Sequence, residues 1–287
     1  MNGSITNKLA GVVILYNPAS QKTLENILSY STGLKKLYIL DNSEQQYAEW
    51  ELLSKQIGDH VEYINYAYNE GIAKRLNTAA HKAIHEGFDY LLTMDQDSSF
   101  PVGAFDKYLN EIENCSITNV GQFGVNFQPQ FTAIETMPME VLSLITSGSI
   151  INLNYFQTIG NYNENLFIDF VDLEFSYRVN NSGYKVVQFT NIILNHQIGD
   201  RVPGRSFKTF KVTHRIIHSP IRVYYIARNG LFLIFKAKNI SKNARFDILR
   251  GMKILKNNYI YHPQLFKIYL FTIVGIFDFL RNKMGKK

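Results

Sequence analysis

The chain of 287 residues is long enough to bury a sizeable core in one or two domains. Its composition, 46% hydrophobic with seven prolines, excludes a disordered or collagen-like protein. Its net charge of +6 is unevenly distributed, because residues 1–200 hold 11 Lys and Arg against 22 Asp and Glu, whereas residues 201–287 hold 19 against two. A basic C-terminal part favours phosphorylated substrates or an anionic membrane surface. Without a zinc-finger spacing or an aromatic ribonucleoprotein motif, we do not expect nucleic acid as a partner.

Compartment and membrane topology can also be inferred from the sequence. Cys115 is the single cysteine, so an intrachain disulfide is impossible and a reducing compartment is expected. The N-terminus carries no basic segment followed by a long apolar core, which favours the cytoplasm. No stretch offers the roughly 20 uncharged apolar residues of a membrane span. Ile268–Phe277 comes nearest, and its basic flanks indicate either a helix lying in a membrane interface or a core helix with a solvated end.

The front half of the chain alternates short apolar runs with segments of helical periodicity. Strands are expected at Gly11–Tyr16, Leu37–Leu40, Val61–Tyr66 and Tyr90–Met94, and helices at Ser20–Tyr30 and Ile72–His85. Ser20 is expected to cap the first helix, and Pro101 to lie in the first turn of the helix after the fourth strand. This alternation implies an α/β fold with a mostly parallel sheet and helices on both faces.

Beyond about residue 115 the pattern is less regular. Strands are expected at Val120–Phe127, Glu140–Ile145, Tyr184–Phe189 and Ile192–His196, helices near 153–158 and at Asp169–Asn181, and a polar loop at 128–139. From about residue 206 the chain is expected to be helical and basic. We therefore predict two domains, an α/β domain at 1–205 and a basic helical region at 206–287.

Polar residues gather at the ends of the first four predicted strands, at positions 16–17, 41–43, 69–71 and 95–97. Open parallel sheets bind ligands at the carboxyl ends of their strands. The four placements predict a site at this edge. Asp95 and Asp97, two residues apart on a sharp turn, could share Mg²⁺ or Mn²⁺ because both ions prefer hard oxygen ligands. An isolated pair of this kind is more often a solvated turn, but its position after a buried strand favours the metal site.

Two further residues are candidates for chemistry. Asp172 lies in the first turn of a predicted helix, where the helix dipole favours an ionised carboxylate that can accept a proton. Its alternative role is an ordinary helix cap. His196 ends an apolar strand and could be a third metal ligand, although a lone histidine is usually a hydrogen-bonded structural residue.

Several motifs occur in a familiar order: ILYNP, ILDNS, YNEGIAKRLNTAA, YLLTMDQDSSF, TSGSIINLNYFQTIGNYNENLFIDFVDLEFSYR, GYKV and LNH. Together they resemble family 2 glycosyltransferases of the GT-A fold, and most closely the bacterial rhamnosyltransferase branch. The resemblance covers roughly residues 9–200, and HSPIRVYYIARN at 218–229 also resembles that branch.

The resemblance implies a role for each matching position. Tyr16 and Asp41 would contact the nucleobase, while Asn69 and Gly71 would line the base and ribose. Asp95 and Asp97 would bind the metal and diphosphate, and His196 would complete the metal shell. Asp172 would be the catalytic base, and Ser147 and Gly148 would approach the acceptor or donor sugar. Val171 replaces the usual Glu of the family, which leaves Asp169 as a substitute support for the base.

These expectations lead to an inverting, metal-dependent glycosyltransferase that uses Mg²⁺ or Mn²⁺. We expect dTDP-L-rhamnose as donor, with UDP-hexose or UDP-galactofuranose as alternatives. The expected acceptor is a lipid-linked saccharide at the inner face of the bacterial cell membrane, in cell-surface polysaccharide synthesis, with the enzyme peripheral to that membrane. A non-catalytic nucleotide-sugar or polysaccharide-binding protein and a nucleotidyltransferase are the rival classes. The sequence leaves the linkage and the oligomeric state open.

Overall fold

The structure, a computed structural model, describes residues 5–127, 135, 137–196, 200–205, 210–237 and 240–287. The chain separates into two compact units. The first unit comprises residues 1–164 and 175–197, and the second unit comprises residues 165–174 and 198–287. The expected division into 1–205 and 206–287 stays a prediction, and most of the expected loop at 128–139 lies outside the described residues.

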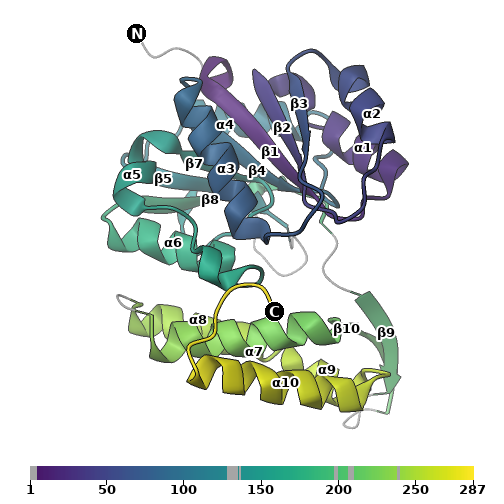
Figure 1. The fold of residues 1–287 in the computed structure, drawn as a ribbon. Coiled ribbons are helices and arrows are strands. Elements are labelled where there is room, and N and C mark those ends of the chain that lie inside the picture. Colours follow the sequence, from purple (N-terminus) through teal and green to yellow (C-terminus); the bar gives the residue numbers. More distant parts are fainter. Residues whose placement is uncertain (1–4, 128–134, 136, 197–199, 206–209, 238–239) are drawn as a thin grey trace. The chain divides into compact units, whose positions relative to one another are not determined.

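The first unit is built on a mostly parallel sheet with the strand order β3-β2-β1-β4-β7-β5-β8-β6 (Figure 1). β1 pairs in parallel with β2 and β4, whereas β7 runs antiparallel between β4 and β5. The strands are β1 Leu9–Leu15, β2 Lys36–Asp41, β3 Val61–Asn65, β4 Tyr90–Asp95, β5 Val120–Asn126, β6 Met139–Glu140, β7 Ser149–Asn152 and β8 Lys185–Ile193. The predicted α/β class is confirmed.

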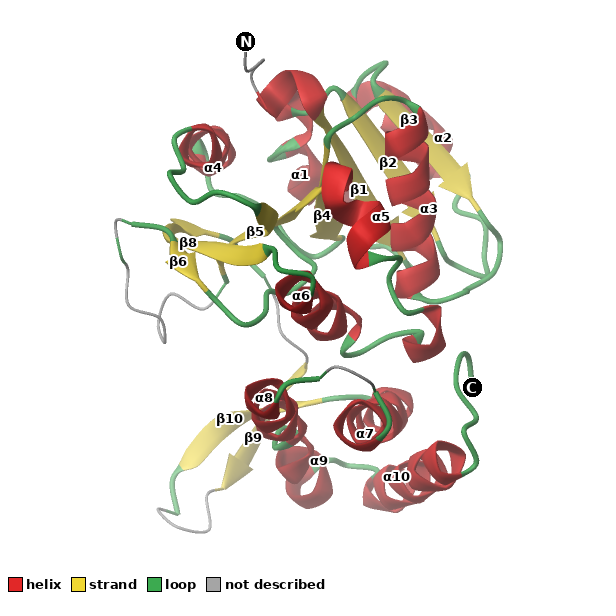
Figure 2. Cartoon of the chain, turned by 90° about the vertical axis from the view of Figure 1, so that its left-hand side faces the viewer, coloured by secondary structure: helices red, strands yellow, loops and turns green. Residues whose placement is uncertain are grey.

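Helices cover both faces of this sheet. They are α1 Ser20–Leu28, α2 Glu49–Ile57, α3 Ile72–His85, α4 Ala104–Glu113, α5 Phe156–Ile159 and α6 Val171–Asn181. Figure 2 shows α3 and α5 on the opposite side of the sheet from α4. On the α4 side, side chains such as Leu9, Val13 and Trp50 share one buried core with α1 and α4. Burying each such aliphatic side chain contributes about 1.5–3 kcal/mol.

The strongest sequence signals gave the most accurate elements. Helix α3 has the predicted bounds, because Leu76, Ala79, Ala80 and Ala83 form one buried stripe at helical spacing. The first four strands agree within two residues at each end.

The predicted helix starts were wrong in detail. Ser20 is the first residue of α1 and not its cap; its hydroxyl bonds to Glu49. Pro101 precedes α4, which begins at Ala104 after the left-handed Gly103.

Strand predictions between residues 140 and 196 also needed correction. Only Met139–Glu140 forms a strand where Glu140–Ile145 was expected; Leu144 is buried through packing against Gly124 without a strand ladder. Strand β7 was not predicted, because four residues are too short to show a period. The two strands expected at 184–196 are one, β8, with Asn195 bridged to Ser99 beyond its end.

The second unit is not entirely helical. It contains the hairpin β9 Asp200–Arg205 and β10 Val212–Ile217, followed by α7 Pro220–Phe235, α8 Lys242–Met252, α9 Leu255–Tyr261 and α10 Leu265–Leu280. The expectation of helix from about residue 206 is therefore wrong at β10, where the β-branched residues of VTHRII favour a strand. The helices pack closely: a Cβ on Gly275 of α10 would lie 2.8 Å from the Tyr224 carbonyl oxygen of α7. None of the described helices is both long and apolar enough to cross a membrane.

Candidate active site

Asp95, Asp97 and His196 come together at the carboxyl end of β4. Each offers one ligand atom, and these three atoms all lie within 4.8 Å of one another. Asp95 ends β4, and the turn after it places Asp97 beside the histidine, with Oδ1 of Asp97 3.4 Å from Nδ1 of His196. The bridge between Ser99 and Asn195, with N–H···O distances of 3.0 and 2.9 Å, holds the two segments side by side.

The donor set of this cluster fits a divalent cation. Two carboxylate oxygens and one imidazole nitrogen suit Mn²⁺, and the carboxylates also suit Mg²⁺. Ligand atoms 4.8 Å apart or closer can be bridged by one ion, since metal–oxygen bonds span about 2.0–2.6 Å. The Ser98 hydroxyl lies 2.7 Å from Nδ1 of His196 and 3.3 Å from Oδ1 of Asp97. One hydroxyl group therefore contacts both the imidazole ring and the carboxylate.

Gln96, between the two aspartates, ties this turn to the end of β1. Its Nε2 donates to the Tyr16 carbonyl at 3.1 Å, and its Oε1 accepts from the Tyr16 N–H at 2.8 Å. The Gln96 carbonyl in turn accepts from Nδ2 of Asn26 at 2.9 Å. Tyr16 as a whole is 45% exposed. These hydrogen bonds could not be predicted from the sequence, where Gln96 is only the residue between two aspartates.

Asp41, expected to contact the nucleobase, has no exposed surface. Its Oδ1 accepts from the Ser43 N–H at 2.9 Å, and its Oδ2 accepts from the Tyr63 hydroxyl at 2.8 Å and from Asn65 at 3.3 Å. Burial raises the pKa of Tyr63, and its bond to Asp41 acts in the same direction, so the phenol stays a proton donor at neutral pH. Asp41 therefore joins the ends of β2 and β3.

Asn69 and Gly71 belong to a second network that also contains Asn42 and Arg75. Oδ1 of Asn69 accepts from the Gly71 N–H and from Nδ2 of Asn42, both at 2.8 Å. Oδ1 of Asn42 accepts from Nε of the buried Arg75 at 2.8 Å. The same guanidinium lies 3.4 Å from the Tyr66 ring centroid. Sequence reasoning missed Arg75, although an arginine within the apolar stripe of a helix is a signal of a buried polar partner.

Ser147 and Gly148, expected to approach a sugar, are both buried behind the metal cluster. The Ser147 hydroxyl accepts from the Asp95 N–H at 3.2 Å, and the Gly148 N–H donates to the Thr93 carbonyl at 3.0 Å. Gly148 has φ +77°, and a Cβ there would lie 2.6 Å from a Val125 methyl group, so packing alone requires glycine. The structure shows a bracing contact of these residues with the end of β4, and their approach to a sugar stays a prediction.

Asp172 lies in the second unit, in the first turn of α6. It is half-buried, and its Oδ1 accepts from the Leu173 N–H at 2.9 Å. Asp169, considered as a substitute for the missing Glu, has a side chain that is only 8% exposed and that pairs with Arg222 of α7. Phe167, Asp169 and Phe170 just before α6 all have φ between 62 and 67°, which costs on the order of 1–3 kcal/mol each.

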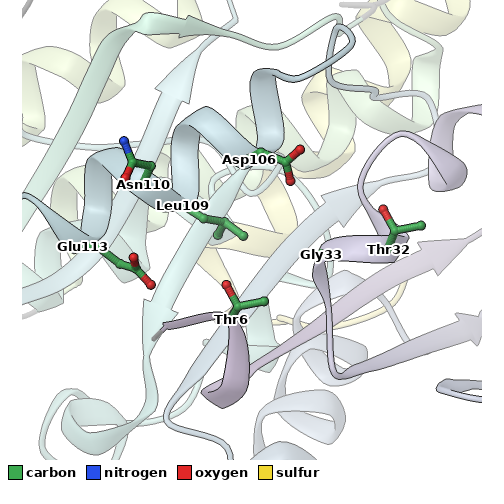
Figure 3. A pocket seen from close by; sticks show the side chains of 7 residues that line it. All are labelled: Thr6, Thr32, Gly33, Asp106, Leu109, Asn110 and Glu113. Carbon is green, nitrogen blue, oxygen red and sulfur yellow. The ribbon is translucent and has the colours of Figure 1, made fainter. Parts of the chain in front are cut away.

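A separate hollow of about 310 Å³ lies at the other edge of the first unit's sheet (Figure 3). It is lined by Thr6, Thr32, Gly33, Asp106, Leu109, Asn110 and Glu113. Thr6 precedes the amino end of β1, whereas the metal cluster lies at the carboxyl end of the neighbouring strand. We assign no chemistry to this hollow.

Comparison with known proteins gives concordant results. The profile of glycosyl transferase family 2 matches residues 12–172. The chain is 28% identical over 255 residues to the dTDP-rhamnosyl transferase RfbF of Shigella flexneri, which corresponds to 81% of either chain.

Two solved glycosyltransferase structures show the same fold. Residues 1–349 of S. aureus TarS in complex with UDP-GlcNAc match with a TM-score of 0.59 and 13% identity, over 96% of this chain and 81% of that one. Mannosyltransferase PcManGT from Pyrobaculum calidifontis, in complex with GDP-Man and Mn²⁺, matches with a TM-score of 0.57 and 13% identity, over 96% of this chain and 88% of that one. At this identity the two structures speak for the fold alone. Because the family profile spans more than half of its length, the chain belongs to glycosyl transferase family 2, and its fold is GT-A.

Proposed function

We propose that the protein transfers L-rhamnose from dTDP-L-rhamnose to a saccharide acceptor, with inversion at the anomeric carbon and with the help of a divalent cation. The cluster of Asp95, Asp97 and His196 carries this proposal, because it places three metal-compatible ligand atoms at the ligand-binding edge of the sheet. The identity with a dTDP-rhamnosyl transferase over most of both chains supports the donor.

In this proposal Asp95, Asp97 and His196 would hold Mg²⁺ or Mn²⁺. A bound cation supplies electrostatic neutralisation of the charge that develops on the leaving group. Ser98 and Ser147 keep the ligands in place through their hydroxyl groups, one on the imidazole and the other on the Asp95 N–H. PcManGT and its Mn²⁺ complex support a manganese ion in a protein of this fold.

The nucleoside is bound by residues at the neighbouring strand ends. The exposed ring of Tyr16 stacks on the base, since aromatic faces favour planar ligands. Asp41 acts through Tyr63 and Asn65, which it fixes at the end of β3. Asn69 and Gly71 line the base and ribose. Arg75 supports their turn through its hydrogen bond to Asn42.

Asp172 is the base that removes the proton from the acceptor hydroxyl. The acceptor oxygen then forms a bond to the anomeric carbon while the bond from that carbon to the diphosphate oxygen breaks. One displacement of this kind inverts the configuration. The position of Asp172 at a helix N-terminus supports the role, because the helix dipole favours its ionised form.

The acceptor is a lipid-linked saccharide, and the protein works from the cytoplasm as a peripheral protein of the inner membrane face. The outer face of α10 supports this part of the proposal. Its exposed apolar residues recur at helical spacing: Phe266, Tyr269, Leu270, Ile273, Phe277 and Leu280. Lys267 lies between the first two of them, and the basic residues from Arg281 onward follow them. This combination is typical of a helix that lies in an anionic membrane interface.

A donor panel tests the proposal. The purified chain is incubated with Mn²⁺ or Mg²⁺, a bacterial lipid-linked saccharide extract, and dTDP-L-rhamnose, a UDP-hexose or UDP-galactofuranose. We expect metal-dependent transfer of label to the organic-extractable fraction, fastest with dTDP-L-rhamnose and abolished by EDTA. Faster turnover of a UDP-sugar would show that dTDP-L-rhamnose is not the preferred donor. Binding of every donor without nucleotide release would favour a non-catalytic binding protein, and pyrophosphate release from a nucleoside triphosphate would favour a nucleotidyltransferase.

A further inference from the structure

The segment Phe167–Phe170 has an unusual backbone directly ahead of α6. Phe167, Asp169 and Phe170 are left-handed although none is glycine. Such conformations persist only where surrounding contacts over-determine them. The Glu174 N–H donates to the Phe170 carbonyl at 3.0 Å, so the first turn of α6 starts from this strained segment. The conformation of the segment therefore determines where the helix begins.

One side chain of α7 binds the backbone of this segment. Asn229 is fully buried, and its Nδ2 donates to the carbonyl oxygens of Leu166 and Ile168 at 2.8 Å and of Asp169 at 3.1 Å. The two N–H bonds of the Asn229 amide are thus shared among three carbonyl oxygens of this segment and the residue before it. The Leu166 carbonyl also accepts from the Ile168 N–H and from Arg228. Truncation of Asn229 would therefore remove a donor chiefly from the part-buried carbonyls of Ile168 and Asp169, which costs more than losing an exposed hydrogen bond.

Two neighbours on the same face of α7 hold the side chains of the segment. Arg222, Tyr225 and Asn229 follow one another at helical spacing. The Arg222 guanidinium pairs with both carboxylate oxygens of Asp169. The Tyr225 ring stacks on Phe167, with centroids 5.1 Å apart and planes 19° from parallel. Helix α7 thereby contacts the backbone, the charge and an aromatic ring of one short segment.

We propose that Asn229, assisted by Arg222, is a positioning residue for Asp172. This inference rests on the proposed function, in which Asp172 is the base. By fixing Phe167–Phe170, α7 fixes the start of α6 and so the direction of the carboxylate, which lies two residues beyond Phe170. A displacement of a catalytic group by about 1 Å can cost on the order of 100-fold in rate. Contacts of α7 with this segment, all within the second unit, then affect the orientation of the proposed base.

The chain offers a matched control for Asn229. Asn258 is also a fully buried asparagine of the second unit, and it bonds to backbone groups of His218 and Ile254, away from the segment. Nucleotide release is measured with the donor that the wild type turns over fastest, together with Mn²⁺-dependent affinity for its nucleoside diphosphate and the melting temperature. We expect Asn229→Ala to lower kcat by about 10- to 100-fold with nucleotide affinity within about twofold. Asn258→Ala should lower the melting temperature comparably, but kcat by less than about threefold. Equal losses of kcat in the two variants would overturn the positioning role.

A double variant tests whether Asn229 acts through Asp172. In an Asp172→Asn background, Asn229→Ala should lower the residual rate by less than about threefold, because residues that act through one group are non-additive. An undiminished effect would refute the inference. Near wild-type turnover of Asp172→Asn alone would instead refute the base assignment on which this inference rests, while the transferase activity itself would stand.

Hydrogen exchange of peptide 165–175 provides a readout that is independent of activity. Exchange should rise in Asn229→Ala and not in Asn258→Ala; unchanged exchange would show that Asn229 does not hold the segment. If Asn229→Ala fails to fold, a variant of the half-exposed Arg222 tests the same contact. Arg222→Ala should lower kcat at unchanged nucleotide affinity, and Arg222→Lys should restore part of it. Unaltered kcat in Arg222→Ala would count against the proposal.

Discussion

Nδ1 of His196 lies 3.4 Å from Oδ1 of Asp97, although the two residues come from segments that the sequence separates widely. The bridge between Ser99 and Asn195 produces this proximity, since each partner is close to one of the two ligands. The proximity of Asp97 and His196 in the candidate metal site therefore depends on a backbone contact between two distant segments.

Loss of His196 should weaken metal binding. We expect His196→Ala to raise the dissociation constant for Mn²⁺ by at least about tenfold, because even indirect supports of a metal ligand contribute about 10- to 100-fold. Calorimetric titration with MnCl₂ measures the change. Elevated Mn²⁺ should recover part of the transfer activity. His85→Ala, on the exposed end of α3, is the matched control and should bind Mn²⁺ like the wild type.

Loss of the Asp172 carboxylate should stop chemistry and leave donor binding intact. We expect Asp172→Asn to lower kcat by about 10²- to 10⁴-fold, the usual contribution of a general base. Mn²⁺-dependent affinity for dTDP should stay within about twofold, because the proposed donor residues do not include Asp172. Turnover close to that of the wild type would remove Asp172 from the mechanism.

Gln96 should matter for nucleotide binding, because its amide fixes the backbone of Tyr16 from both sides. We expect Gln96→Ala to weaken dTDP binding by about three- to tenfold, which corresponds to the net free energy of one or two hydrogen bonds. Gln188→Ala, which removes a single bond to the Val125 carbonyl on a distant strand, is the control. Equal dTDP affinities of the two variants would contradict a special role for Gln96.

Alkaline pH should destabilise the fold through buried tyrosines. Burial raises the pKa of Tyr108 well above its ordinary value, so above about pH 10 the unfolded chain loses a proton that the folded chain keeps. Each such group then lowers the free energy of unfolding by about 1.4 kcal/mol per pH unit. Among the described residues, the Tyr108 hydroxyl has no hydrogen-bond partner.

We therefore expect Tyr108→Phe to match the wild type in stability at pH 7 and to exceed it at pH 11, measured by urea unfolding. Tyr63→Phe is the contrasting variant, because it removes a donor from the buried carboxylate of Asp41. It should lose about 1–3 kcal/mol already at pH 7. A loss of similar size in Tyr108→Phe at pH 7 would show that the Tyr108 hydroxyl makes a stabilising interaction, contrary to its lack of a hydrogen-bond partner among the described residues.

The exposed face of α10 should bind anionic vesicles. Co-sedimentation with phosphatidylglycerol-containing vesicles should exceed that with phosphatidylcholine alone, and salt should reduce it. Phe266→Glu and Ile273→Glu place charges on this face and should each reduce binding several-fold. Val102→Glu, at a fully exposed residue of the first unit, should leave vesicle binding unchanged. Equal binding by all three variants would argue against α10 as the membrane contact.

The sequence by itself determined the α/β sheet, helix α3 and the edge where Asp95, Asp97 and His196 come together. Apolar periodicity reports directly which residues are buried, and parallel strands leave their polar ends at one edge. It also identified the Asp-Gln-Asp turn, the metal-compatible histidine and the family. Short elements such as β7 could not be predicted from the sequence, because four residues show no measurable periodicity. The strand is stabilised by its pairing with β4 and β5.

Only the tertiary structure decided what each site residue touches. Asp41, Ser147 and Gly148 are buried supports, while Gln96 and Arg75 hold strand ends that the sequence left unconnected. Asn229 contacts the segment ahead of Asp172 from a helix far along the chain. Hydrogen bonds between distant segments depend on three-dimensional proximity, which local periodicity does not encode. Most candidate site residues could therefore be identified from the sequence, whereas their hydrogen-bond partners could be identified only from the tertiary structure.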